Sequence, residues 1–423
     1  MINYSNHTLS NGLTVMLHED ANTPLVSVNV LYNVGARDED PNRTGFAHLF
    51  EHLMFGGTKE VPDYDLVVNS VGGESNAFTN NDYTNYYLTV PASSLETALA
   101  LEADRMRLLD FSERSLSVQQ HVVTEEYHQR YENQPYGDVH MLLRPLCYKK
   151  HPYQWCTIGS DIRHVQQARL EDVEQFFFRY YRPENAILAV AGPIKSKEAL
   201  RLVEHHFGNI PSGGAFDPNE AKAFARSYPQ EDEQTERREL TVERQVPNDA
   251  LYMAFPMCDR RHPDYYVFDI ISDVLSNGKS SRLYNSLVKE RQIFTEINAY
   301  ISGETDNGLF LFSGRMHENV SVKEGEKAIW EELERIKAEL IPDLELLKVV
   351  NKYETTFLFS QYKALDRAMG LCYYEWLGMT ERVNTEPDYY KPITPERVRE
   401  VAHNCFQPEK CSVLYYLKSR KEK

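Results

Sequence analysis

The chain has 423 residues, of which 42% are hydrophobic and 12% aromatic, and this length exceeds the size at which a single hydrophobic core stops growing. We therefore expect at least two packed domains, and the composition excludes a largely disordered chain. The net charge of −17 argues against nucleic acid as the main partner, because phosphate binding needs clustered Lys and Arg; it suits either a cavity that attracts basic peptides or plain solubility.

The cysteines and the N-terminal residues predict a reduced, cytoplasmic protein. Six cysteines, at positions 147, 156, 258, 372, 405 and 411, form no C-x-x-C pair, which disfavours a cysteine-based zinc site. The N-terminus lacks a basic region followed by an apolar run, so we expect no signal peptide. No apolar stretch reaches the roughly 18 residues that a membrane span needs, and no membrane span is expected.

In chain order, the patterns alternate between strands and helices in each half. The first half predicts strands at 12–18, 26–32, 83–90 and 186–192, and helices at 45–55, 94–108, 112–133 and 170–181. Residues 211–236 are rich in Pro, Gly and charge, and predict a linker. Strands at 239–246 and 250–255 and a helix at 262–275 follow. We expect an α+β protein with domains 1–210 and 237–423.

A weak internal repeat indicates that the two domains are similar. In both 170–192 and 394–417, a helix runs into an aromatic residue, one further residue, Pro-Glu and then an apolar strand. When the two segments are aligned at one constant offset, Tyr181 matches Phe406 and Pro183 matches Pro408. The repeat predicts two α/β domains of one topology, each with helices packed on a mainly antiparallel sheet.

The segment TGFAHLFEHLMFGG, residues 44–57, carries the clearest chemical signal. Thr44 can cap the start of a helix and Gly56 can end it. Phe46, Leu49, Phe50, Leu53 and Met54 recur at helical spacing and predict the buried stripe of this helix.

His48 and His52 are four residues apart, so on a helix both imidazoles can bind one ion. Zinc readily accepts imidazole nitrogen, and catalytic zinc sites use three protein ligands and a water. Glu51 precedes the second histidine and is placed to take a proton from that water. The order H-x-x-E-H is that of the inverzincins; the alternative is a surface helix with two histidines and a glutamate.

Several motifs in one order resemble the pitrilysin/insulinase family of zinc peptidases, in the two-domain branch that includes mitochondrial processing peptidase subunits. The similarity covers nearly the whole chain, in segments 12–39, 45–58, 72–90, 122–126, 181–192 and 280–291. The resemblance implies a zinc metalloendopeptidase, and a chain that forms half of a clamshell around its peptide.

The resemblance also implies the third ligand. In QQHVVTEEYHQ, residues 119–129, the family pattern places it at Glu126, far along the chain from His52, with Glu125 as the alternative. Neighbouring carboxylates on a helix point about 100° apart, so only one of them can face the ion. Family members often carry a further Glu two turns earlier, where this chain has Gln119. A glutamine there accepts a hydrogen bond but brings no charge to a histidine ligand.

For the substrate, the segment 72–87 resembles the family's peptide-binding edge. Asn76, Ala77 and Phe78 would form an edge strand to which a peptide adds through its main chain. The alternative is a plain hairpin edge before the turn residues Asn80, Asn81 and Asp82.

The family also supplies an Arg and a Tyr that stabilise the reacting carbonyl, and the matching positions here hold Val288 and Thr295. Arg291 and Tyr300 lie nearby but out of register. We therefore expect a paralogous partner subunit that supplies the Arg/Tyr pair in a heterodimer. The alternatives are a non-catalytic core subunit of a complex, and a peptide-binding subunit that keeps the metal only for stability.

Overall fold

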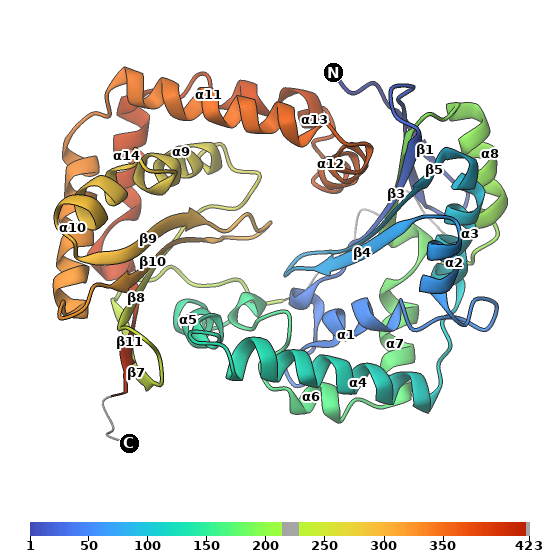
Figure 1. Ribbon diagram of the computed structural model, residues 1–423, viewed down its shortest axis with the longest axis horizontal. Coiled ribbons are helices and arrows are strands. Elements are labelled where there is room, and N and C mark those ends of the chain that lie inside the picture. The colour runs from blue at the N-terminus through green and yellow to red at the C-terminus, as the bar shows by residue number, and fades with distance from the viewer. Residues whose placement is uncertain (214–227, 420–423) are drawn as a thin grey trace. The chain divides into compact units, whose positions relative to one another are not determined.

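The computed structural model describes residues 1–213 and 228–419 and divides into two compact units (Figure 1). Unit 1 comprises residues 1–129, 155–229 and 358–385. Unit 2 comprises residues 130–154, 230–357 and 386–423. The middle of the predicted linker 211–236 lies outside the described residues. In the part of the chain that is described, no helix is long and apolar enough to cross a membrane.

The sheet of unit 1 has six strands in the order β1-β2-β6-β3-β5-β4. Their bounds are β1 Ser5–Thr8, β2 Thr14–Glu19, β3 Leu25–Tyr32, β4 Glu74–Thr79, β5 Thr84–Pro91 and β6 Ala186–Gly192. Among these strands the β2–β6 pair is parallel and the other pairs are antiparallel. The order leaves β4 at one edge, paired with β5 alone.

Helices cover both faces of this sheet. Those of unit 1 are α1 Phe46–Leu53, α2 Tyr64–Ser70, α3 Leu95–Arg107, α4 Glu113–Tyr127, α6 Arg163–Gln166, α7 Leu170–Tyr180, α8 Ser196–Phe207, α12 Ala364–Trp376 and α13 Arg382–Thr385. Figure 1 shows α3 and α8 on one side of the strands and α12 on the other. The α12 face is apolar where Leu371 and Cys372 pack against Leu31 and Ala189.

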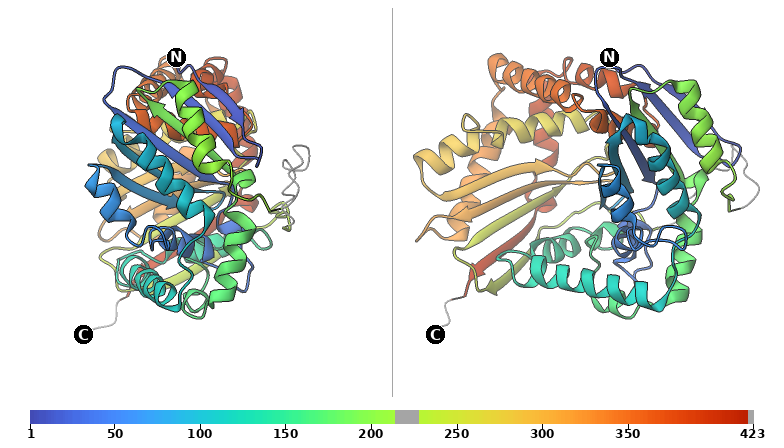
Figure 2. Two further views of the ribbon diagram at one scale, coloured as in Figure 1. Left: turned by 90° about the vertical axis from the view of Figure 1, so that its right-hand side faces the viewer. Right: turned by 45° about the vertical axis from the view of Figure 1, so that its right-hand side comes forward.

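The sheet of unit 2 has five strands in the order β7-β11-β8-β10-β9, which run side by side in the right-hand view of Figure 2. Their bounds are β7 Arg238–Arg244, β8 Ala250–Pro256, β9 Phe294–Ile301, β10 Leu309–Met316 and β11 Ser412–Lys418. The β7–β11 pair is parallel and the remaining pairs are antiparallel. Both sheets are therefore mainly antiparallel, as the sequence predicts.

The pleat of β8 separates two cores in unit 2. Met253 and Phe255 face a core with α9 Tyr265–Ser276, α10 Val322–Ala338 and α14 Pro395–Cys405. Tyr252 and Ala254 face the opposite core with α5 Val139–Cys147. Helix α11 Asp343–Ser360 begins in unit 2, and its last three residues are grouped with unit 1.

The two units share one topology, and the repeat extends beyond the segment that revealed it. The same offset that relates the starts of helices α7 and α14 also relates strands β5 and β10 and helices α5 and α12. The order β2-β6-β3-β5-β4 of unit 1 corresponds to β7-β11-β8-β10-β9 of unit 2, with the parallel pair first in each. Two similar α/β domains are therefore confirmed.

The matching helices α5 and α12 are exchanged between the units. Helix α5 lies in the first half of the chain but packs on β8 and β11 of unit 2. Helix α12 lies in the second half but packs on β3 and β6 of unit 1. The compact units thus differ from the contiguous ranges 1–210 and 237–423, because each sheet buries one face under a helix from the other half of the chain.

Candidate metal centre

Helix α1 forms where the sequence predicts a helix, and its buried stripe is the predicted one. Phe46, Leu49, Phe50, Leu53 and Met54 are all at most 5% exposed. They fix which face of the helix meets the core, so His48, Glu51 and His52 share the remaining face. His48 is buried, while Glu51 and His52 are partly exposed.

The start of α1 is capped by a residue that the sequence analysis missed. Gly45 occupies the N-cap position with a φ of +90°, and has no side chain to offer. The two oxygens of the buried Glu39 carboxyl group accept hydrogen bonds from the backbone N–H groups of Gly45 and Ala47, both at 2.8 Å. Burial raises the pKa of Glu39 to about 8, although the two N–H donors act to lower it.

Thr44 is not the helix cap that we expected. Its hydroxyl instead lies 3.0 Å from that of Ser160 and 2.9 Å from Nδ1 of His164. A cap supplied by a residue well before the helix breaks the local rule that places it directly at the N-terminus. The sequence carried no local signal for this cap, because Glu39 precedes Gly45 by six residues.

Helix α4 brings Glu126 to the two histidines. Its Oε2 lies 3.3 Å from Nε2 of His52 and 3.6 Å from Nε2 of His48. One donor atom from each of the three residues lies within 4.8 Å of the others. Among the described residues, no other group of three His, Cys, Asp or Glu side chains converges in this way.

This donor set fits a zinc ion. Two imidazoles and one carboxylate are a known set for catalytic zinc, and ligand atoms about 2.1 Å from one tetrahedral ion lie about 3.4 Å apart. The two separations from Glu126 bracket that value. Glu125, the alternative ligand, is exposed and lies outside the cluster. The assignment of His48, His52 and Glu126 as zinc ligands remains a prediction, now with a compatible geometry.

A pair of buried tyrosines, Tyr86 and Tyr181, packs against helix α1. The hydroxyls of Tyr86 and Tyr181 are 3.1 Å apart, and that of Tyr86 donates to the carbonyl of Phe50 at 3.4 Å. Burial raises the pKa of Tyr86 most, its partner Tyr181 adds to the rise, and the nearby Glu51 carboxylate adds further. The charge of Glu51 also acts to raise the pKa of Tyr181.

Gln119 is half-buried on α4, near the end of α1. Its amide nitrogen is 3.8 Å from the position that a Cβ on Gly56 would take. A role for Gln119 in orienting a histidine ligand remains a prediction. The neighbouring Gln120 has a structural task, since its amide donates to the carbonyls of Val165 and Ala168, both at 2.9 Å.

The predicted substrate-binding residues lie on edge strand β4. Asn76, Ala77 and Phe78 pair with Tyr87, Tyr86 and Asn85 of β5, and the opposite edge of β4 has no neighbour in the sheet. Helix α1 packs against this strand, so the histidines and the edge belong to one part of unit 1. The Asn76 side chain accepts a hydrogen bond from the backbone N–H of Ala77 at 2.8 Å.

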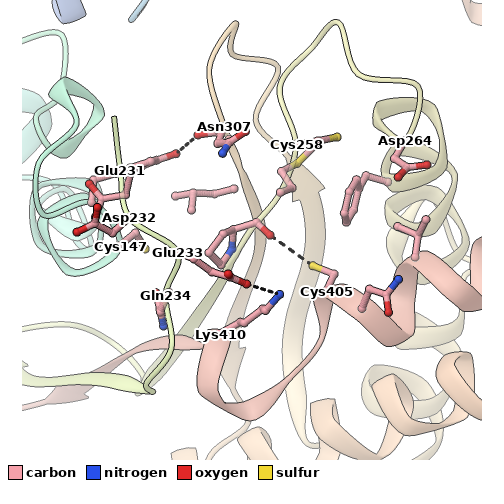
Figure 3. A pocket seen from close by; sticks show the side chains of 18 residues that line it. Cys147, Glu231, Asp232, Glu233, Gln234, Cys258, Asp264, Asn307, Cys405 and Lys410 are labelled. Atoms are coloured by element: carbon pink, nitrogen blue, oxygen red, sulfur yellow. Dashed lines mark hydrogen bonds and ion pairs between the residues drawn. The ribbon is translucent and has the colours of Figure 1, made fainter. Parts of the chain in front are cut away.

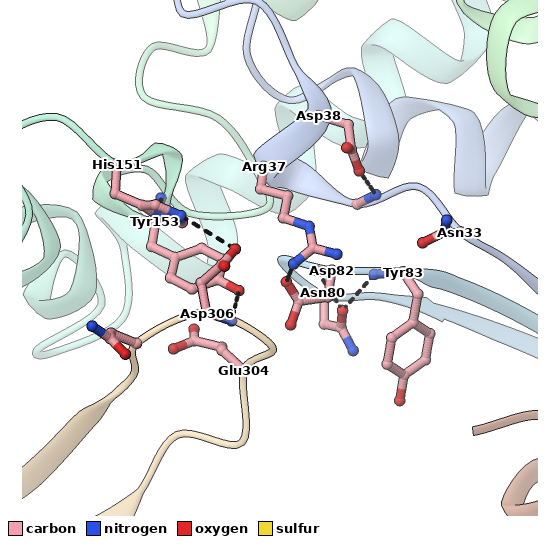
Figure 4. Close-up of polar contacts among 12 residues, drawn as sticks. Asn33, Arg37, Asp38, Asn80, Asp82, Tyr83, His151, Tyr153, Glu304 and Asp306 are labelled. Carbon is pink, nitrogen blue, oxygen red and sulfur yellow. Dashed lines mark hydrogen bonds and ion pairs between the residues drawn. The ribbon is translucent and has the colours of Figure 1, made fainter. Parts of the chain in front are cut away.

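The turn after β4 is held by side-chain hydrogen bonds and an ion pair (Figure 4). The side chain of Asn80 accepts from the backbone N–H groups of Asp82 and Tyr83, both at 2.8 Å. Asp82 forms a buried ion pair with Arg37 at 2.6 Å. Residues Asn80–Asp82 therefore form the turn that was named in the alternative of a plain hairpin edge, and they fix the end of the edge strand.

Unit 2 offers no Arg/Tyr pair at the matching positions. Val288, on the π-helical segment η7 Tyr284–Glu290, packs against the apolar core. The hydroxyl of Thr295 donates to the carbonyl of Arg315 at 3.2 Å. Arg291 is engaged with Glu331 at 2.8 Å.

Unit 2 also carries a changed counterpart of the metal site. At the offset of the repeat, Asp273 and Asn277 match His48 and His52, and the Asn277 amide donates to Asp273 at 2.7 Å. The ammonium of Lys352, next to the position that matches Glu126, donates to Oδ1 of Asn277. A lysine thus supplies the positive charge at these positions.

A cavity of about 540 Å³ lies elsewhere, within unit 2 (Figure 3). Its acidic residues are already compensated. Glu231 accepts from the backbone N–H groups of residues 149–151, and Glu233 pairs with Lys410 at 3.2 Å. None of the candidate metal ligands lines it, so it has no part in the site described above.

Comparison with known proteins identifies the family. The model described as "Insulinase (Peptidase family M16)" matches residues 14–159, and that described as "Peptidase M16 inactive domain" matches residues 167–353. Zinc protease PqqE of Helicobacter pylori is 30% identical over 404 residues, which cover 91% of this chain and 89% of the relative. An uncharacterized zinc protease of Bacillus subtilis, YmxG, is 28% identical and covers 80% of each chain.

Solved structures agree with this relationship. The crystal structure of a protease from Helicobacter pylori matches with a TM-score of 0.92 and 27% identity, over 98% of this chain and all of that one. The periplasmic protease PqqL of Escherichia coli shares the fold at a TM-score of 0.79 and 19% identity, and the match covers 99% of this chain but 48% of PqqL. The chain therefore belongs to the M16, or insulinase, family of peptidases.

Proposed function

We propose that this chain is a zinc metalloendopeptidase, in which His48, His52 and Glu126 hold the ion and Glu51 is the catalytic base. The observation that carries the proposal is the convergence of both histidine Nε2 atoms on one oxygen of Glu126, at 3.3 and 3.6 Å. The relatives named zinc proteases support the choice of zinc. The three ligands lie within the segment matched by the insulinase model, not in that matched by the inactive-domain model.

The residues of the site divide the work of peptide hydrolysis. A zinc ion at this position would supply a Lewis acid and lower the pKa of the attacking water. Glu51 lies on the same helical face as both histidines. It takes a proton from the attacking water as the water oxygen attacks the carbonyl carbon of the peptide bond. Glu51 then delivers a proton to the departing amine nitrogen as the C–N bond breaks.

Strand β4 holds the peptide in this account. Its free edge can pair with an extended chain through main-chain hydrogen bonds, which impose little sequence preference. A folded protein cannot present such a strand without unfolding locally. Unfolded peptides are therefore the expected substrates.

A paralogous partner completes the site in this proposal. Removing a donor that stabilises the reacting oxyanion typically costs about 10²–10³ in rate, and neither Val288 nor Thr295 can act as that donor. A second copy of this chain would lack the same groups. The 48% coverage of PqqL is compatible with a fold that works as paired halves, although that similarity concerns the fold alone.

The test separates an enzyme from a non-catalytic core subunit and from a peptide-binding subunit. We expect the purified chain to contain about one zinc per chain, and to cleave a mixed library of unfolded peptides when its partner is present. Metal without cleavage under any pairing would indicate a binding subunit. Absence of both metal and cleavage would indicate a structural subunit.

A further inference from the structure

Beside edge strand β4 lies a continuous row of half-buried aromatic side chains, here called the aromatic shelf: Phe78, Tyr83, Tyr373 and Trp376. The rings of Phe78 and Tyr83 are 5.8 Å apart, and those of Tyr83 and Trp376 are 4.8 Å apart. Tyr373 lies 6.0 Å from both Tyr83 and Trp376. The shelf thus runs from the outermost strand of the sheet to helix α12.

The β-sheet pleat fixes which face of β4 the shelf occupies. Phe78 is paired with Asn85, and Asn85 with Leu31 of β3. Residues paired across strands share a face, and Leu31 belongs to the apolar cluster that packs on α12. Phe78 and Asn76, two residues apart, therefore both point to the α12 face, whereas Ala77 points to the other.

A hydrogen bond from its backbone fixes Tyr83, and one from its side chain fixes Trp376. The turn that carries Tyr83 is fixed through Asn80, as described above. The indole N–H of Trp376 donates to the side-chain oxygen of Asn33 at 2.7 Å. The inner part of the shelf is therefore preorganised, and a ligand that contacts it would not have to order it first.

The packing of helix α12 on the sheet does not explain the aromatic side chain of Phe78. The helix makes its apolar contacts with β3 and β6, in the middle of the sheet. Phe78 stands on the edge strand, whose outer side has no strand neighbour in unit 1. An aromatic ring that stays partly exposed at an open strand edge is a feature of binding surfaces, where apolar side chains gather outside the core.

We infer that the aromatic shelf selects substrates by the side chains that they place on the α12 face, favouring large apolar or aromatic residues at every second position of the bound peptide. This inference rests on the proposed peptide binding by β4. An added strand alternates its side chains between the two faces, so only alternate residues meet Phe78. Phe78 is the contacting residue, and Tyr83, Tyr373 and Trp376 are positioning residues behind it.

The test uses two peptides of identical composition. In the first, two phenylalanines are separated by one residue, so both fall on one face of an added strand. In the second, the phenylalanines are adjacent and fall on opposite faces. Fluorescence anisotropy measures the binding of each peptide to the zinc-loaded Glu51→Gln chain. This variant should not hydrolyse the peptides, because it lacks the proposed base.

We expect the first peptide to bind about 3- to 10-fold more tightly, the worth of one aromatic contact. Phe78→Ala and Trp376→Ala should remove most of this ratio. Trp376→Phe should retain a large part of it, which guards against a variant that simply misfolds. Tyr362→Ala, which removes an aromatic ring that is 81% exposed outside the shelf, should leave the ratio unchanged.

Equal binding of the two peptides would overturn the inference that the aromatic shelf selects substrates. A binding ratio that persists in both Phe78→Ala and Trp376→Ala would overturn it as well. Failure of every peptide to bind would overturn it together with the role of β4. Zinc content and cleavage by the unsubstituted chain are read separately. A chain that cleaves peptides without the alternating preference would therefore refute this inference and leave the proposed function standing.

Discussion

Oε1 of Glu39 accepts a hydrogen bond at 2.8 Å from the backbone N–H of Ala47, the residue directly before His48. The other oxygen of this carboxyl group accepts from the backbone N–H of Gly45 at the same distance. One buried side chain thus fixes the first turn of the helix that carries both histidines. The position of the two imidazoles relative to Glu126 therefore depends on a residue outside the metal centre.

The first prediction concerns this cap. Glu39→Gln replaces one acceptor oxygen with an NH₂ group that faces a backbone N–H, so the first turn of α1 should shift. Loss of a helix cap costs about 0.5–2 kcal/mol, which corresponds to a zinc affinity weakened roughly 2- to 30-fold if the cost falls on the metal site. Competition with a chromophoric chelator measures this affinity.

A matched control is Asp63→Ala. Asp63 caps helix α2 through a bond from the N–H of Leu66 at 2.9 Å, and α2 bears no candidate ligand. This variant should lose stability and keep its zinc affinity. If both variants weaken zinc equally, or Glu39→Gln does not weaken it at all, the cap is not specific to the metal helix.

The second prediction is a pH dependence of folding. Burial raises the pKa of Glu39 to about 8, above its ordinary value near 4.3. The folded chain therefore holds the proton more tightly than the unfolded chain, and the free energy of unfolding falls as pH rises from about 5 to 8. Glu39→Gln should remove part of this fall, on the order of 2 kcal/mol.

Urea unfolding of the metal-free chain at pH 5 and pH 8 checks this directly. Relative to the unsubstituted chain, Glu39→Gln should gain stability as the pH rises. Burial also raises the pKa of Asp38, to about 7. Asp38 therefore lowers the free energy of unfolding as the pH rises in both the unsubstituted chain and the variant. If Glu39→Gln instead loses stability relative to the unsubstituted chain at pH 8, the N–H donors lower the pKa of Glu39 by more than burial raises it.

Third, Lys352 should stabilise unit 2 in place of a metal ion. Burial raises the pKa of Asp273, and the Lys352 charge opposes the rise. Lys352→Met should therefore lower the free energy of unfolding by about 1 kcal/mol near neutral pH, and the loss should shrink as the pH falls and Asp273 takes up a proton. Lys327→Met, at an exposed position on α10, is the matched control. An unchanged free energy of unfolding at pH 7 would show that the Lys352 contact makes no net contribution to stability.

The metal motif and each copy of the repeated segment were readable from the sequence because each is a local pattern. A helix of period 3.6 and a spacing of four residues place His48 beside His52 without reference to the rest of the fold. The match of Pro183 with Pro408 predicted two similar domains for the same reason. Strand β4 at the sheet edge was predicted from the family resemblance, and the sheet order bears out its edge position.

The remainder depends on contacts between distant segments. Helices α5 and α12 have ordinary amphipathic patterns, which do not specify whose sheet they cover, so the exchange between units was not predicted. The cap by Glu39 depends on how a preceding turn folds back on α1. The aromatic shelf joins Phe78 to Trp376, which lie in opposite halves of the chain, and no local pattern links such positions.

A fourth prediction concerns the partner. The chain alone should bind zinc, but its rate of peptide cleavage should be about 10²–10³ times lower than that of the pair. The measurement is a rate with the chain alone, then with a paralogue that has lost H-x-x-E-H but keeps the Arg/Tyr pair. A chain that is already as fast alone as in the mixture would require another group to stabilise the oxyanion.

The central claim is that Glu51 is the base of a zinc peptidase, and one comparison tests it most directly. Zinc content and peptide cleavage are measured for the unsubstituted chain and for Glu51→Gln, both with the partner present, and with His52→Ala as the variant that should lose the metal. We predict that Glu51→Gln keeps about one zinc per chain and loses nearly all hydrolysis. Full activity in zinc-loaded Glu51→Gln would contradict the account.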